Sequence, residues 1–215
     1  MIYRTTHRRL INQPEIVFDW ALTAPEHANW LVTYFEEATL QGTVFQPDQT
    51  VQVGWIIVML RETDTGDLEI WEPDFDALPI RWIRGVNNLF RHLLLQKSVC
   101  EAMEVTPDFP SLRDSGIVSQ NFLASSQGVM SRDLANGTDS GWVFYPHDYQ
   151  DSEGQHVSLY EITLAHEWLI PFVALPPSSK VSYSKARIVV ESGTKTASSD
   201  DCELLRNLLN APGMV

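Results

Sequence analysis

Hydrophobic and polar positions in the first part of the chain repeat first with the period of a helix. Leu31 and Phe35 recur at helical spacing after Pro25, a residue that suits the first position of a helix. Gly42 follows the last apolar position, and glycine commonly ends a helix. The pattern therefore predicts a helix over residues 25–40.

The pattern then changes to β-rich runs. Residues 51–60 and 68–71 flank the turn-forming sequence Asp64-Thr65-Gly66-Asp67, which predicts a β-hairpin. Helical spacing returns over residues 82–103, where a helix would place Arg84 and Arg91 on a shared face.

The second half of the chain contains more strand-like segments. Strands are predicted over residues 116–123, 128–132, 141–145, 157–164 and 180–190. A short buried helix is expected over 166–175, a polar linker over 192–199, and a terminal helix over 200–209 with Asp200 or Asp201 as its cap.

These elements predict an α+β fold with antiparallel sheets, packed helices and two small subdomains. We expect an acidic α+β region over residues 1–110 and a second α+β domain over 111–199. Residues 200–215 would form a terminal helix and tail.

The chain is strongly acidic, with a formal net charge of −13 over 215 residues. Such a charge disfavours nucleic acid and anionic membranes as partners, because both require clustered Lys and Arg. Residues 10–76 contain 13 acidic residues and only Arg61 as a base, whereas residues 81–97 are basic. One interpretation is that these opposite charges meet inside the fold. The other is that the acidic segment binds a basic protein.

The acidic residues on and after the predicted hairpin are the candidate partner-binding set. They are Glu62, Asp64, Asp67, Glu69, Glu72, Asp74 and Asp76.

The sequence also bears on where the protein is located. The basic N-terminal residues lack the apolar run of a secretory signal, and the longest apolar stretch is too short to span a membrane. Cys100 and Cys202 do not form a disulfide framework, so reduced thiols are expected. A soluble, cytoplasmic protein is the prediction, and its oligomeric state stays open.

Common catalytic and cofactor motifs are absent from the sequence, including the P-loop, the dinucleotide-binding glycine motif, Gly-x-Ser-x-Gly, His-Glu-x-x-His and Cys-x-x-Cys. No cofactor, and no enzymatic activity, is therefore expected. A cluster of potential ligands leaves one alternative open, a metal-dependent hydrolase or small-ligand-binding protein. This cluster, between residues 147 and 166, contains His147, Asp148, Asp151, Glu153, His156 and His166. Glu161 and Glu167 with Asp148 are a separate candidate for a carboxylate pair in acid/base hydrolysis.

One segment carries a family resemblance. Its features are the strand-like Gly116-Ile117-Val118-Ser119, the pair Arg132-Asp133, and Asp139-Ser140-Gly141-Trp142-Val143-Phe144 after a polar turn. With Leu159-Tyr160-Glu161-Ile162 downstream, residues 116–190 resemble the bacterial immunity protein thirty-three-like domain family, formerly a domain of unknown function. The resemblance implies a non-enzymatic protein that binds and occludes a toxin. The acidic residues named above would form the contact surface, which makes a basic toxin domain the expected partner. An adaptor role in a multiprotein assembly is a further alternative.

The motif around Trp142 also has a physical interpretation. Asp139 and Ser140 can hydrogen-bond nearby backbone, Gly141 permits a close approach, and Trp142 can anchor a strand in the core. This pattern favours a structural role, and recognition by Arg132, Asp139 or Trp142 is the alternative.

Overall fold

The computed structural model describes residues 1–6, 13–20, 25–147 and 154–211. More of these residues lie in strands than in helices, and the strands form two sheets of six and seven members. Both sheets are mixed, because each contains one parallel pair, β2–β5 in the first and β7–β9 in the second. The predicted α+β class with antiparallel sheets and packed helices is therefore wrong. Segments expected to be helix or linker pair as strands instead.

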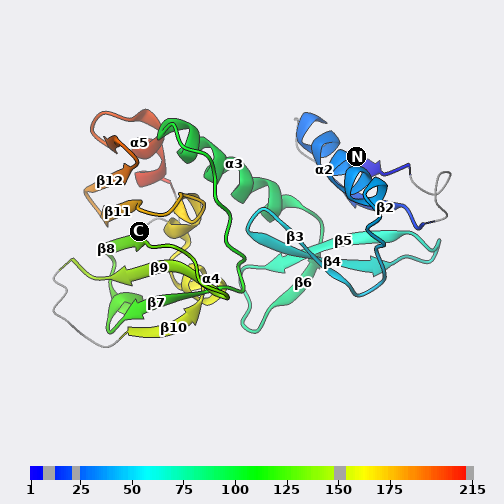
Figure 1. The fold of residues 1–215 in the computed structure, drawn as a ribbon, viewed down its shortest axis with the longest axis horizontal. Helices are drawn as coiled ribbons and strands as arrows, with labels where there is room; N and C mark the ends of the chain where they lie inside the picture. The colour runs from blue at the N-terminus through cyan, green and yellow to red at the C-terminus, as the bar shows by residue number, and fades with distance from the viewer. Residues whose placement is uncertain (7–12, 21–24, 148–153, 212–215) are drawn as a thin grey trace. The chain divides into compact units, whose positions relative to one another are not determined.

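The chain divides into two compact units, Met1–Arg91 and His92–Val215 (Figure 1). The helix α3 (Asn87–Ala102) begins in the first unit and continues into the second. Each unit contains one of the two sheets.

The first unit is built on the six-stranded sheet, whose main path is β1-β2-β5-β4-β3, and β6 also pairs with β5. Its strands are β1 (Ile2–Arg4), β2 (Ile16–Asp19), β3 (Thr50–Val53), β4 (Ile56–Glu62), β5 (Leu68–Asp74) and β6 (Arg81–Arg84). Its core contains the fully buried Leu31, Phe35 and Trp55. Burial of such side chains contributes about 1.5–3 kcal/mol each.

The helix α2 (Pro25–Leu40) has the predicted bounds. Gly42 follows the end of the helix, as expected, and has a φ of 96°. The Gly42 amide donates to the Thr39 carbonyl and the Thr43 amide to the Ala38 carbonyl. These two bonds satisfy carbonyls that the helix end would otherwise leave unpaired.

The hairpin predicted between residues 51–60 and 68–71 forms between β4 and β5. The Thr63 amide donates to the Asp67 carbonyl across the turn. The first run is not one strand, however, because Gly54 turns with a φ of 62° and separates β3 from β4.

The helix predicted over 82–103 begins later than expected. Residues Arg81–Arg84 form β6, and Gly85 has a φ of 126°, a conformation that ends the strand and that a helix cannot include. Arg84 therefore does not share a helix face with Arg91.

The second unit is built on the seven-stranded sheet, in the order β10-β7-β9-β8-β11-β12-β13. Its strands are β7 (Ser115–Ser119), β8 (Gly128–Arg132), β9 (Asp139–Tyr145), β10 (Gly154–Ser158), β11 (Lys180–Ser184), β12 (Arg187–Ser192) and β13 (Lys195–Ser198). The helical segments are η1 (Phe122–Ala124), α4 (Leu159–Ala165), η2 (Glu167–Phe172) and α5 (Glu203–Leu209). Its core includes Trp168 and Tyr183, whose stacked ring centroids lie 4.1 Å apart.

Several predicted elements of this unit change type or length. The run 116–123 ends as a strand at Ser119 and continues into η1, and the helix expected over 166–175 is the six-residue η2. Most of the strand predicted over 157–164 is the helix α4, because the Ser158 hydroxyl accepts a hydrogen bond from the Glu161 amide and caps it.

The C-terminal segments also differ from the expectation. The run 180–190 is the hairpin β11–β12, and the expected linker 192–199 contains β13, which pairs with β12. The residue at the start of α5 is Cys202 rather than Asp200 or Asp201. Asp201 accepts instead from the Ser198 amide at 2.7 Å.

Candidate functional site

The seven acidic candidate residues lie along β5 and at its two ends, and only three are exposed: Glu62, Asp64 and Asp76. Glu62 and Asp64 lie at the tip of the β4–β5 hairpin and are called here the acidic tip. Asp76 follows the other end of β5. A seven-residue strand is about 23 Å long, so the structure does not bring Asp76 next to the acidic tip.

Asp67 and Glu69 bind groups of the first unit. The Asp67 carboxylate is 3% exposed and accepts from Arg4 at 2.8 Å. The Glu69 carboxylate accepts from the indole nitrogen of Trp71 at 3.0 Å and from Arg84 Nε at 2.7 Å.

Glu72 binds the beginning of α3. It is 1% exposed, and its two oxygens accept from the Asn88 amide at 3.0 Å and the Leu89 amide at 2.8 Å. Burial raises the pKa of Glu72, and the backbone hydrogen bonds oppose that rise. A carboxylate at this position satisfies amides that a helix start leaves unpaired.

Asp74 pairs with Arg81, which lies opposite it in the β5–β6 register. The hydrogen bond from Arg81 lowers the pKa of Asp74. With the Glu69–Arg84 pair, this contact means that part of the acidic and basic segments meet within the first unit.

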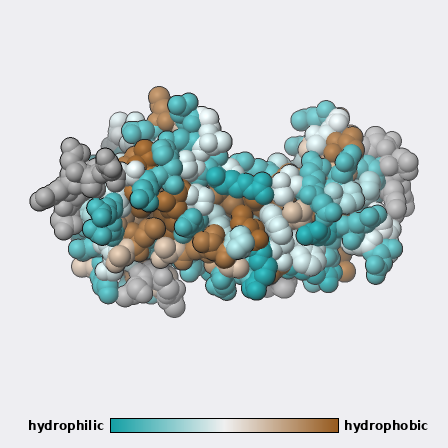
Figure 2. Space-filling model, turned by 90° about the horizontal axis from the view of Figure 1, so that it is seen from below, coloured by the Kyte–Doolittle hydropathy of each residue, from teal (hydrophilic) through white to brown (hydrophobic). Residues whose placement is uncertain are grey.

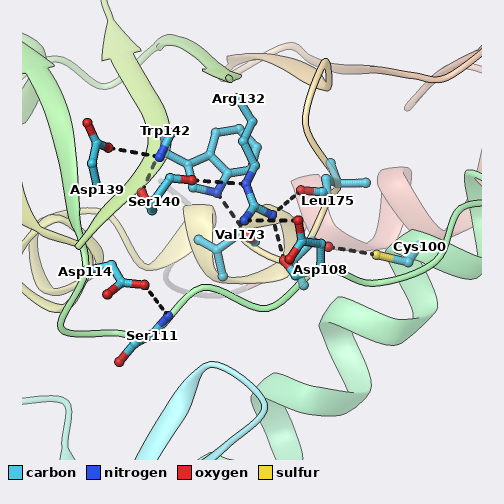
Figure 3. Close-up of polar contacts among 12 residues, drawn as sticks. Cys100, Asp108, Ser111, Asp114, Arg132, Asp139, Ser140, Trp142, Val173 and Leu175 are labelled. Atoms are coloured by element: carbon cyan, nitrogen blue, oxygen red, sulfur yellow. Dashed lines mark hydrogen bonds and ion pairs between the residues drawn. The ribbon is translucent and has the colours of Figure 1, made fainter. Parts of the chain in front are cut away.

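The motif residues of the second unit surround Arg132, the last residue of β8, which is 2% exposed (Figure 3). Its Nη1 donates to the carbonyls of Asp108 and Leu175, both at 2.6 Å, and its Nε donates to the Ser140 carbonyl at 3.3 Å. The Asp108 carboxylate lies 3.6 Å from Nη2. Charge-assisted bonds of this kind compensate for burial of the guanidinium.

Three different elements hold three successive carbonyls after η2. Arg132 binds the Leu175 carbonyl, the Trp142 indole nitrogen donates to that of Val173 at 3.0 Å, and Cys100 Sγ lies 3.5 Å from that of Ala174. The guanidinium carbon also lies 5.7 Å from the centroid of the Trp142 ring. We call Arg132, Trp142 and Cys100, with the carbonyls they bind, the Arg132 centre.

The residues before Trp142 shape the backbone there. The Asp139 carboxylate accepts from the Gly141 amide at 2.9 Å, and the Ser140 hydroxyl donates to the Ser115 carbonyl at 2.7 Å. Gly141 has a φ of 79°, and a Cβ atom there would lie 2.2 Å from the Asp133 carbonyl oxygen. These contacts give Asp139, Ser140 and Gly141 structural roles.

The described histidines of the alternative ligand cluster each contact a different part of the second unit. His147 contacts the Tyr183 carbonyl, His156 the Ser115 hydroxyl and His166 the Phe122 carbonyl. Asp148, Asp151 and Glu153 lie outside the described residues. Within the described ranges, no group of three His, Cys, Asp or Glu side chains is placed to hold a metal ion.

Sequence reasoning did not identify a pocket in the second unit. It has a volume of about 710 Å³ and lies beside β7, η1 and β10. Residues that line it include Ser119, Gln120, Asn121, Leu123, Gln155 and Val157. Its residues come from separate segments, so the only local sequence signal is the cluster of Ser and amide side chains at 119–121.

Two further features concern the whole described chain. Neither described cysteine forms a disulfide, and Cys100 is buried. Among the described helices, none has both the length and the apolar character needed to cross a membrane.

Comparison with known proteins gives one match. No curated protein and no solved structure matches the chain significantly. The model of the Imm33-like domain family matches residues 95–191, slightly less than half of the chain, and confirms the resemblance expected for 116–190. Residues 95–191, which include the whole Arg132 centre, thus match the Imm33-like domain family.

Proposed function

We propose that this protein is a non-enzymatic immunity protein that binds a toxin domain and occludes its working surface. The observation that carries the proposal is the family match over residues 95–191. In this proposal the matched region supplies the scaffold, and the acidic first unit selects the partner.

The acidic tip is the proposed contact surface. Glu62 and Asp64 are exposed, and no ion pair among the described residues involves either of them. They belong to the segment 10–76, whose net charge is −12. A basic toxin surface that binds nucleic acid would accept these carboxylates in place of phosphates. Asp67, Glu69, Glu72 and Asp74 are occupied by contacts within the first unit, so the proposed surface is limited to the acidic tip.

Charge reversal at the acidic tip tests the proposal. A toxin domain encoded beside this gene would serve as the partner, and binding of the Glu62→Lys, Asp64→Lys double variant would be measured by calorimetry at two salt concentrations. We expect the dissociation constant to rise by about tenfold or more, and its salt dependence to become flatter, because exposed interface charges act over long range.

The matched control is the double variant Asp133→Lys, Glu191→Lys, which makes the same charge change at exposed positions of the second unit. We expect the dissociation constant of this variant to stay within about twofold of that of the unchanged protein, since exposed charges away from the interface contribute little to binding. Equal weakening by both variants, or none by the first, would refute the acidic tip as the contact surface. A neighbouring toxin domain that the unchanged protein neither binds nor inhibits would refute the immunity role itself.

A further inference from the structure

We propose that the pocket beside β10 binds an extended peptide segment, which adds as a strand to the outer edge of β10 and places an uncharged side chain in the pocket. The proposal concerns the second unit and does not depend on the acidic tip.

In the part of the chain that the structure describes, the outer edge of β10 has none of the usual protection of an edge strand. It is the last strand of its sheet, and among the described residues it pairs only with β7 (Figure 1). Its sequence, Gly154-Gln155-His156-Val157-Ser158, contains no Lys, Asp, Glu or Pro, and its first three residues are exposed. Natural edge strands usually carry such residues to prevent pairing with another chain.

The opposite edge of the same sheet provides a contrast. The strand β13 begins with Lys195, whose ammonium group pairs with Glu104 at 2.5 Å. A charge on an edge strand discourages the addition of another strand. The two edges of one sheet therefore differ, and only the β10 edge adjoins the pocket.

The pocket is suited to an uncharged side chain. Among the described residues, none of those that line it is charged. Gln155 and Val157 are two positions apart in β10 and so point to the same face of the strand. A strand added to β10 would place alternate side chains over that face, within reach of the pocket. Figure 2, seen from below, shows apolar residues at the surface on that face of the second unit.

The wall of the pocket also contains a polar group without a partner. Ser119 is 5% exposed, and its hydroxyl has no hydrogen-bond partner among the described residues. A buried, unsatisfied hydroxyl costs free energy, so its retention at a pocket favours a role in binding. The amide side chains of Gln120, Asn121 and Gln155 add donors and acceptors of the kind that a peptide backbone uses.

A displayed library of random nine-residue peptides tests the proposal with the full chain as bait. We expect enriched peptides to have uncharged side chains at alternate positions. Their contacts are located by amide chemical-shift changes, which we expect at Ser119, Gln155 and Val157. If no peptide is enriched, or if the shift changes lie elsewhere, the proposal is overturned.

Variants then separate pocket binding from general effects on the fold. Ser119→Ala should weaken binding of the enriched peptides by about three- to tenfold without lowering the unfolding temperature, because the lost hydroxyl makes no hydrogen bond to another described residue. Val157→Lys should abolish binding by placing a charge at the pocket. The matched control Thr196→Lys, on β13, should bind as the unchanged protein does. The proposal would be refuted if Ser119→Ala and Val157→Lys both bound the enriched peptides with full affinity. If Val157→Lys does not fold, the affinity of Ser119→Ala alone tests the proposal.

Discussion

Gly141 shows how the family motif acts at the scale of a residue. Its positive φ and the 2.2 Å distance from an added Cβ to the Asp133 carbonyl oxygen leave no room for another side chain. The hydrogen bond that the Asp139 carboxylate accepts from the Gly141 amide holds the same turn. The sequence favoured a structural role at this position, because a glycine between Asp139-Ser140 and a tryptophan suits a tight turn before a strand. That role stays a prediction.

Replacement of this glycine should therefore cost more than replacement of a glycine in open space. We expect Gly141→Ala to lower the free energy of unfolding by about 2–4 kcal/mol, because it adds a clash to the strain of a positive φ. The control is Gly137→Ala, where φ is 61° but no atom lies within 4 Å of the added Cβ. That variant should cost only about 1 kcal/mol. Urea unfolding followed by tryptophan fluorescence measures both, and equal losses would contradict the clash.

At the scale of elements, polar side chains determine where two of the helices begin. Glu72 in β5 binds the first amides of α3, although sequence reasoning assigned it to a partner surface. Ser158 begins α4 in a segment that was predicted as a strand. The Ser-x-x-Glu signature at Ser158 and Glu161 was readable in the sequence. The contact of Glu72 was not, because it joins residues 16 positions apart.

Removal of the Glu72 carboxylate should destabilise the beginning of α3. We expect Glu72→Ala to lower the free energy of unfolding by about 1–3 kcal/mol, since it leaves two amides without an acceptor. Glu62→Ala, at an exposed position on the same hairpin, should change it by less than about 0.5 kcal/mol. Thermal and urea unfolding by circular dichroism measure both variants. A similar effect of the two would show that Glu72 does not support the helix.

At the scale of the whole molecule, the charge is divided between surface and interior. The basic segment 81–97 does more than reduce the net charge of the acidic segment 10–76, because two of its residues form direct ion pairs with acidic residues. Arg81 and Arg84 pair with Asp74 and Glu69 in the first unit, which leaves the hairpin tip as the exposed acidic part of that hairpin. The interpretation that opposite charges meet inside the fold therefore applies to the pairs along β5. The interpretation that the acidic segment binds a basic protein applies, as a proposal, to the acidic tip.

Stability of the whole molecule should also depend on pH through His166. Burial lowers the pKa of this histidine from its ordinary value of 6.5. As pH falls through about 6.5, His166 therefore binds a proton in the unfolded chain, whereas in the folded protein it stays neutral until a lower pH. The contribution of His166 is fully present above that pH and is lost as pH falls towards the folded pKa.

Urea midpoints at pH 7.5, 6.5 and 5.5 measure this effect. We expect His166→Gln to reduce the loss of stability on acidification, by no more than about 1.4 kcal/mol per pH unit for one proton. The exposed His156 provides the control, and His156→Gln should keep the slope of the unchanged protein. If both variants kept that slope, His166 would not be the group responsible.

The sequence by itself determined features that depend on neighbouring residues: the helix from Pro25 to Leu40, the hairpin at Asp64–Asp67 and the motif that leads into Trp142. Only the tertiary structure decided the parallel pairs within the two sheets, the internal partners of the acids along β5, the carbonyls around Arg132 and the pocket beside β10. The physical reason is the range of the interactions. Turns and caps are local, whereas strand pairing, ion pairs and pockets depend on residues far apart in the chain.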